Sequence, residues 1–203
     1  MNWSLNTTSI NDKSALIIEN LQEESIAVFC FIQDQKDNGS VTENKLLQFI
    51  FRSFYRLDNA GLTNTFKNRY FQLLEDSKSK DSNLRKICED LYEIKNHKDQ
   101  NTLQFSFATK LINTLNPKLP IYDLQVAKMY AYKNLPTTKP FQERLESYMS
   151  FYEHLDSDYQ KIFEKGLLQP AISKFDNKFE KYKDKICQNK KLDFILWSAG
   201  KLA

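Results

Sequence analysis

Glycine and proline are scarce in this chain, which has four glycines and five prolines among its 203 residues. Tight turns between short strands depend on these two residues, because glycine supplies positive φ angles and proline presets the first turn position. Apolar residues instead recur at spacings of three and four, for example at Leu47, Ile50 and Phe54. Such spacing is typical of amphipathic helices. We therefore predict an all-α protein with about nine helices.

The boundaries of these helices follow from capping and breaking residues. The strongest break is the run Asn116-Pro117-Lys118-Leu119-Pro120, because two prolines three residues apart forbid a continuous helix. We place Asp123 at or near the N-cap of the helix that follows, and Thr138 as the cap of a later one. The expected helices are residues 12–36, one capped by Ser40 and Glu43, 62–75, 84–96, 103–115, one capped by Asp123, 141–165, 171–188 and 192–200.

Composition excludes several classes of protein. A hydrophobic content of 41% and a charged content of 27% exclude a disordered chain. Three widely spaced cysteines and two histidines give no zinc or iron–sulfur pattern, so we expect free thiols and neither metal nor cofactor. The longest apolar run, residues 26–32, is about a third of a membrane span, and residues 1–11 lack a signal pattern. We expect a cytoplasmic protein without a membrane partner.

Two stretches of the sequence resemble a known family. Residues 120–128 read PIYDLQVAK, between a helix and the start of another. They resemble the P-[VI]-x-D-x-x-V-x-[RK] motif of the helix-hairpin-helix DNA glycosylase superfamily, in its adenine and 8-oxoguanine branches. Residues 191–201, KLDFILWSAGK, are similar to the last helix of small glycosylases with an 8-oxoguanine-glycosylase fold. With the helix before the motif, the matching stretches cover under a fifth of the chain.

The resemblance implies an architecture and an activity. Two helical lobes would flank a cleft within a single glycosylase-like unit, residues 1–203. One lobe would run from about residue 40 to 135 and include the hairpin-like segment 84–133, and the N-terminal helix with residues 137–203 would form the other. The implied activity is excision of a base from double-stranded DNA by a monomer. The base would be an oxidised purine, or a hypermodified base such as glycosylated hydroxymethylcytosine in phage DNA.

The family motif assigns the catalytic carboxylate to Asp123. Cleavage of an N-glycosidic bond builds positive charge on the deoxyribose, which a nearby carboxylate stabilises while it activates the attacking group. A helix N-terminus favours the ionised form of this carboxylate. In the family a lysine nucleophile, where present, lies one helix earlier, and Lys110 is the nearest lysine there. Strict alignment instead puts Ser106 at that position, so attack by lysine and attack by water both stay open.

The hairpin departs from the family pattern. The family grips a DNA phosphate with the backbone amides of a Gly-hydrophobic-Gly turn, whereas residues 99–106 contain no glycine. Either the hairpin is degenerate and polar side chains replace the backbone amides, or DNA binding is not the function of this protein. The candidate side chains are Asn101, Thr102, Gln104 and Ser106.

Charge is unevenly distributed along the chain. The net charge is +3, but residues 174–191 hold seven lysines against three acidic residues, which gives +4 there and −1 elsewhere. On one continuous helix, four of these lysines would form a stripe suited to a DNA backbone. They are Lys174, Lys178, Lys181 and Lys185. The alternative function is a non-catalytic module that binds DNA or a protein through this stripe.

Four further residues complete the predicted site. Lys128 and Lys133 are expected to contact phosphates, together with Lys181 and Lys185 of the stripe. Because an extruded base needs an aromatic pocket, Trp197 and Tyr122 are the expected pocket residues.

Overall fold

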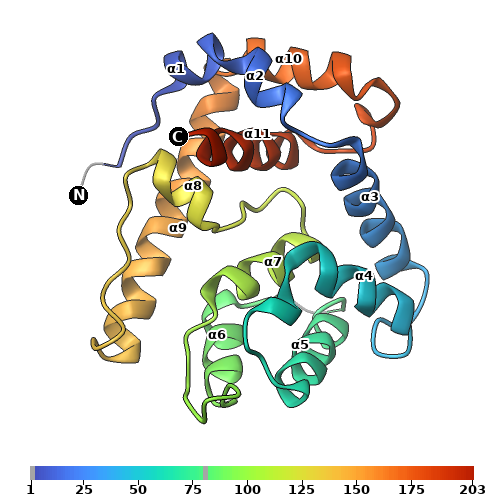
Figure 1. Ribbon diagram of the computed structural model, residues 1–203, viewed down its shortest axis with the longest axis vertical. Helices are drawn as coiled ribbons and strands as arrows, with labels where there is room; N and C mark the ends of the chain where they lie inside the picture. Colours follow the sequence, from blue (N-terminus) through green and yellow to red (C-terminus); the bar gives the residue numbers. More distant parts are fainter. Residues whose placement is uncertain (1–2, 80–81) are drawn as a thin grey trace. The chain divides into compact units, whose positions relative to one another are not determined.

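The computed structural model describes residues 3–79 and 82–203. Lys80 and Asp81, between the helices predicted at 62–75 and 84–96, and residues 1–2 lie outside this description. The described residues contain helices and no strand (Figure 1), which confirms the all-α prediction. The helices are α1 (Thr7–Asp12), α2 (Ser14–Glu19), α3 (Glu23–Asp37), α4 (Lys45–Tyr55), α5 (Asn64–Asp76), α6 (Leu84–Tyr92), α7 (Phe105–Leu115), α8 (Leu124–Met129), α9 (Phe141–Glu164), α10 (Gln169–Lys178) and α11 (Gln188–Leu202), with 3-10 turns η1 (Leu57–Asn59) and η2 (Glu180–Tyr182).

The chain divides into two compact units. The first combines Met1–Ile26 with Pro117–Ala203, and the second is Ala27–Asn116. The family resemblance implies that residues 117–135 lie with the segment that starts near residue 40, but the structure groups them with the C-terminal helices. One boundary falls at the proline-bounded break, where the backbone leaves α7, and the other lies within α3, between Ile26 and Ala27.

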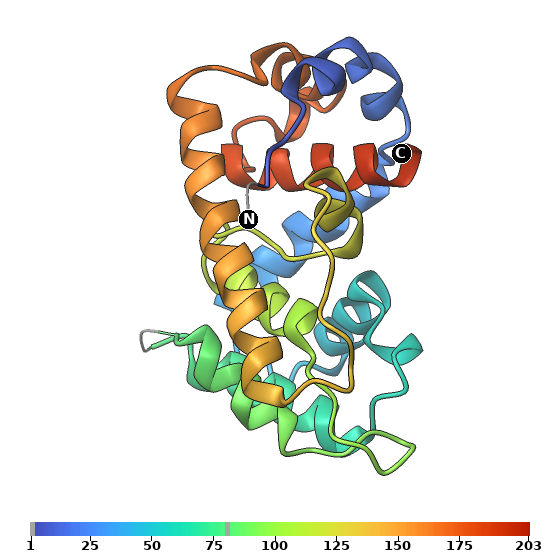
Figure 2. The ribbon, with the colours of Figure 1, turned by 90° about the vertical axis from the view of Figure 1, so that its left-hand side faces the viewer.

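The first unit is built around α11. This helix packs against α8 on one side and against α2 and α10 on the other, and α9 runs past it (Figures 1 and 2). Ten of its fifteen residues are buried, which suits a helix enclosed by neighbours rather than one on a surface. Ser198 donates a hydrogen bond to the carbonyl of Ile17 at 2.7 Å and so links α11 to α2.

Aromatic side chains fill the core of the second unit. Phe51 of α4 contacts the rings of Tyr70 and Phe71 of α5 at 5.7 and 5.6 Å between centroids. The Tyr70 hydroxyl donates to the backbone carbonyl of Phe107 in α7 at 3.0 Å, which satisfies the one polar atom of a fully buried ring. These contacts join α4, α5 and α7 around a common core.

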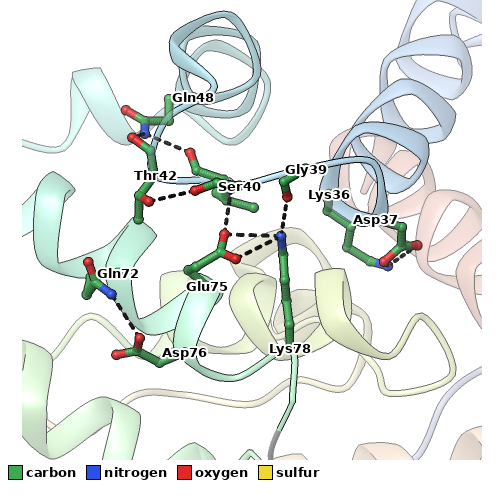
Figure 3. Close-up of polar contacts among 11 residues, drawn as sticks. Lys36, Asp37, Gly39, Ser40, Thr42, Gln48, Gln72, Glu75, Asp76 and Lys78 are labelled. Carbon is green, nitrogen blue, oxygen red and sulfur yellow. Dashed lines mark hydrogen bonds and ion pairs between the residues drawn. The ribbon is translucent and has the colours of Figure 1, made fainter.

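The turn between α3 and α4 is fixed by α5 rather than by the predicted capping box at Ser40 and Glu43. Asn44 is the N-cap of α4 and accepts the N–H of Leu47 at 2.9 Å. Figure 3 shows how distant side chains complete the turn: Glu75 accepts the N–H of Val41 at 2.5 Å, and Lys78 donates to the carbonyl of Gly39 at 2.7 Å. The box prediction was wrong because Asn44, four residues after Ser40, is the N-cap of this helix instead.

Two long predicted helices are interrupted. The helix expected over 12–36 is split into α2 and α3, and Lys178 donates to the carbonyls of Ile18 and Leu21 at 3.0 and 2.8 Å where α2 ends. The helix expected over 171–188 stops at Lys178 and continues as η2. A cap supplied from about 160 residues away leaves no signal in the local sequence. Thr138 does not cap α9, whose N-cap is Pro140.

The three cysteines, Cys30, Cys88 and Cys187, are free thiols, as predicted. Burial raises the pKa of the Cys88 thiol to about 12, so it stays protonated. Among the described helices, none has the length and apolar character to cross a bilayer.

Candidate active site

Asp123 is the N-cap of α8, as the sequence predicted. Its backbone is extended, with φ −136° and ψ 151°, and its Oδ1 accepts the N–H of Gln125 at 2.9 Å. The side chain is half-buried. The cap therefore fixes the carboxylate at the start of α8 in one orientation.

Residues 117–123, which lead into this cap, are held by side chains from α9, from α11 and from its N-cap. The carbonyl of Pro117 accepts a hydrogen bond from the Cys187 thiol at 3.1 Å, and the carbonyl of Lys118 accepts one from Asn189 at 2.6 Å. The Pro120 carbonyl accepts the hydroxyl of Tyr152, from α9, at 3.0 Å. Backbone groups of an irregular segment are thus paired one after another with side chains distant in the sequence.

Asp193 makes the fourth of these contacts. Its Oδ1 accepts the N–H of Ile121 at 3.2 Å and the hydroxyl of Tyr159 at 2.8 Å. Both donors are themselves buried, so this oxygen satisfies two groups that water does not reach. Ile121 lies two residues before Asp123, which connects the core of α11 to the candidate catalytic residue.

Lys190 completes a buried charged cluster. Its Nζ lies 3.6 Å from Oδ2 of Asp193, and both residues are about as buried as the apolar core, at 3% and 5% exposed. Burial lowers the pKa of Lys190, against the charges of Asp193 and Asp123. Burial also raises the pKa of Asp193 to about 6, although the ammonium of Lys190 opposes the shift. Desolvation is thus the dominant effect on both members of the pair.

A close approach between the backbones of α11 and α8 lies next to the Asp123 N-cap. A Cβ placed on Gly200 would lie 2.1 Å from the backbone oxygen of Gln125, a distance that no side chain tolerates. Only glycine allows the two backbones to approach in this way. Gln125 is the residue whose N–H binds Asp123, so α11 contacts this short helix at its capped end.

Lys110 and Ser106 lie together one turn apart on α7. The ammonium donates to the Ser106 hydroxyl at 3.1 Å and lies 5.0 Å from the centre of the Phe107 ring. The Tyr55 ring of α4 is also within cation–π range, at 5.8 Å. The two alternatives for the nucleophile position are therefore hydrogen-bonded to each other. They belong to the second unit, whereas Asp123 belongs to the first.

The glycine-free turn between α6 and α7 is closed on itself. The side-chain oxygen of Asn96 accepts the N–H groups of Lys98 and Gln100 at 2.8 and 3.1 Å. Asp99 has a left-handed backbone with φ of 57°, and its N–H donates to the carbonyl of Asn96. Three consecutive backbone amides are thus occupied by Asn96. Of the side chains expected to replace them, Gln104 donates to Thr102 at 2.8 Å and Asn101 to the carbonyl of Tyr92.

The predicted phosphate-binding lysines fall into two groups. Lys128 near the end of α8, Lys133 after it and Lys185 after η2 are exposed. Lys181 is exposed as well but forms an ion pair with Glu23. The stripe itself is not formed on one helix, because α10 ends at Lys178.

Two members of the expected stripe bind the N-terminal helices instead. Lys174 donates to the hydroxyl of Ser14 at 2.8 Å. Lys178 donates to three backbone carbonyls around the end of α2, including that of Glu19 at 3.0 Å. Both lysines therefore join α10 to α2 within the first unit, a structural role that the sequence analysis did not anticipate.

The two expected pocket residues differ in their surroundings. Tyr122 is buried among aromatic rings, with centroids 5.1 Å from Tyr148 and 6.0 Å from Phe151, and its hydroxyl donates to Asn134 at 2.6 Å. This places Tyr122 in the aromatic core of the first unit. Trp197 is partly exposed on α11, and the ammonium of Lys201 lies 4.2 Å from its ring centre.

Sequence reasoning gave no role to Lys190, Asp193 or Tyr159. The available signal was a lysine and an aspartate three residues apart in a run that is otherwise largely apolar. Charged residues at buried helical positions are rare unless they are paired. Among the described residues, no group of histidine, cysteine or acidic side chains has the arrangement of a metal site.

Comparison with models of protein families, with curated proteins and with solved structures finds no match to this chain. The chemistry and geometry of its own residues therefore carry the functional argument.

Proposed function

We propose that this protein is a DNA glycosylase that uses Asp123 to cleave the N-glycosidic bond of a damaged or modified base. The observation that carries the proposal is the fixation of residues 117–123 by hydrogen bonds from α9 and α11. A carboxylate that stabilises an oxocarbenium-like transition state must be held in place before charge develops, because reorganisation during the reaction costs rate. Asp123 has such support on both sides of the α8 cap.

In the proposed reaction the Asp123 carboxylate lies next to the deoxyribose as the bond to the base breaks. The departing base takes the bonding electrons and is protonated, while a nucleophile adds to the sugar carbon. Water as the nucleophile leaves an abasic site. The amine of Lys110 as the nucleophile leaves an imine to the enzyme, which later hydrolyses or undergoes strand cleavage. The proposed fold is accordingly glycosylase-like, with helical lobes on either side of a DNA-binding cleft.

The contacts within each unit indicate which residues would bind DNA phosphates in the proposed function. Lys128 is exposed five residues after Asp123, roughly 7.5 Å further along the axis of α8, and can reach a phosphate next to the cleaved nucleotide. The amides of the α6–α7 turn are occupied by Asn96, so phosphate contacts in the second unit would come from side chains such as Gln104. The alternative module, which depends on the lysine stripe, is less favoured because Lys174 and Lys178 are engaged with α2.

The test uses duplex DNA with a single modified base and scores abasic sites by alkaline cleavage. Duplexes with 8-oxoguanine and with glucosylated hydroxymethylcytosine cover the two substrate classes. Asp123→Asn keeps a side-chain oxygen for the N-cap and removes only the charge, so we expect a folded protein with activity reduced ~100-fold or more. Asp158→Asn, which changes an aspartate elsewhere in the first unit, is the matched control. Equal activity in Asp123→Asn and the wild type would contradict the proposal.

Borohydride trapping separates the two nucleophiles. A covalent adduct in the wild type that disappears in Lys110→Ala indicates lysine attack. Abasic sites without any adduct indicate water, with Asp123 still required. Lys67→Ala, which changes another partly exposed lysine of the same unit, controls for a general loss of positive charge.

A further inference from the structure

The geometry points to Asp193 as the residue that positions Asp123, by holding the backbone of residues 117–123 through the N–H of Ile121. This inference rests on the proposed role of Asp123 and extends it to the core of α11. Asp193 itself is buried and does not touch the DNA, so it acts through the segment and not on the substrate.

The position of Asp193 is determined from several directions. Its Oδ1 receives one hydrogen bond from α9, through Tyr159, and one from the segment, through Ile121. Its Oδ2 faces the ammonium of Lys190 one helical turn away. A buried carboxylate is expensive unless each oxygen has partners, and here both have them. The Ile121 N–H is therefore one of three partners that offset the cost of burying this carboxylate.

The surrounding groups bear on the charge of this carboxylate. Lys190 faces it from α11 itself, Tyr159 and Tyr152 from α9, and Tyr130 from the end of α8. Asp123 reaches the same cluster through its electrostatic interaction with Lys190. The ammonium of Lys190 therefore interacts with both the candidate catalytic carboxylate and the buried one.

The distance along the chain makes the coupling direct. Ile121 and Asp123 are separated by one residue, and the backbone of Asp123 is extended, so a shift of the Ile121 amide moves the N-cap by a similar amount. Misplacement of a reacting group by about 1 Å is enough to cost ~100-fold in rate. Because substrate binding depends on other residues, the loss of rate should appear as a lower kcat with little change in KM.

The test removes the acceptor without leaving an unpaired charge. Lys190→Met with Asp193→Leu replaces the buried pair by apolar side chains of similar size, a change that proteins commonly tolerate. We expect hydrogen exchange at the Ile121 amide to accelerate ~10-fold or more, with a smaller acceleration at Gln125, whose N–H binds Asp123. On the 8-oxoguanine or glucosylated hydroxymethylcytosine duplex, kcat falls ~10-fold or more and KM changes less than about twofold.

A matched control distinguishes positioning from general packing. Tyr132→Phe removes a tyrosine hydroxyl that shares a hydrogen bond with the hydroxyl of Ser147, also on α9, at 3.0 Å and leaves Ile121 untouched. It should change neither hydrogen exchange at the Ile121 amide nor kcat. Tyr159→Phe, in contrast, should accelerate exchange at Ile121 and lower kcat, as the double variant does. Asp193→Asn, which retains an oxygen acceptor, should recover most of the Ile121 protection.

The exchange measurement needs no substrate, so the two proposals fail separately. Wild-type protein without activity on either duplex overturns the glycosylase function, while the exchange data still decide whether Asp193 holds the segment. Unchanged exchange at Ile121 and Gln125 in the folded double variant overturns the positioning role, whatever the activity. Faster exchange with unchanged kcat also overturns it, because Asp123 would then function without that support.

Discussion

The two irregular segments that the family resemblance highlights are stabilised in opposite ways. Residues 96–101, between α6 and α7, pair mainly with one another, and Asn96 supplies the acceptors for three amides within four residues. Residues 117–123 pair with Cys187, Asn189, Tyr152 and Asp193, between 32 and 72 residues further along the chain.

This difference shows which of the two segments depends on the packing of its unit for its backbone conformation. A locally closed turn forms wherever its own residues are present, but a segment paired with distant side chains takes its shape from the packing of the whole unit. The second arrangement suits a catalytic residue, whose position must be reproducible. The first leaves the turn with no open row of amides for a phosphate, so in the proposed function its contacts with DNA would come from side chains.

The largest expected effect comes from Gly200→Ala. The added Cβ would meet the Gln125 backbone at 2.1 Å, and backbone cannot move aside as a flexible side chain does. We expect the free energy of unfolding to fall by about 4 kcal/mol, measured by urea denaturation. Gly166→Ala, in the same unit, has open space around its Cβ and a φ of 61°, so it should cost only about 1 kcal/mol. Equal costs would show that α8 and α11 are not in close contact.

The second largest effect is a dependence of the unfolding free energy on pH. We expect it from Asp193, which pairs with residues 117–123, and not from the local turn at residues 96–101. The pKa of Asp193 is about 6 in the folded protein and near 3.8 when unfolded, so between these values the folded state binds the extra proton. Raising the pH from about 4 to 7 should lower the unfolding free energy by about 2 kcal/mol relative to Lys190→Met with Asp193→Leu. The lowered pKa of Lys190 has the opposite consequence: it makes the unfolding free energy rise, relative to the same double variant, as the pH increases further.

Urea titrations of both proteins across this pH range provide the measurement. Groups common to the two proteins cancel in the difference, which isolates the buried pair. A difference that stays constant with pH would mean that Asp193 is as well solvated in the folded chain as in the unfolded one.

The smallest effect is expected at the local turn. Asn96→Ala removes the acceptor for the N–H groups of Lys98 and Gln100, and we expect a loss of about 1 kcal/mol by thermal denaturation. Hydrogen exchange should accelerate at these two amides and stay unchanged at Ile121. Asn38→Ala, which removes an exposed contact to Asp34, should change the stability by less than about 0.5 kcal/mol. A change at Ile121 would contradict the separation of the two segments.

The features predictable from the sequence are those with local causes. The apolar spacing of α4, the proline break after α7 and the cap at Asp123 depend on residues within a few positions of one another, and the structure has all three. The ends of α2 and α10 were missed because Lys178 contacts residues about 160 positions away. The buried pair of Lys190 and Asp193 was missed for the same reason, since its meaning depends on Tyr159 and Ile121.

The dependence of residues 117–123 on α11 has a consequence for synthesis of the chain. Asp193 follows Ile121 by 72 residues, so at ~5–20 residues per second the ribosome adds it about 4 to 14 s later. Throughout that interval the nascent chain already holds Asp123 but lacks the helix that orients it. Residues 27–116, by contrast, are complete before Asp123 is made and can fold first. The order of translation therefore delays the fixed orientation of Asp123 until α11 has been made.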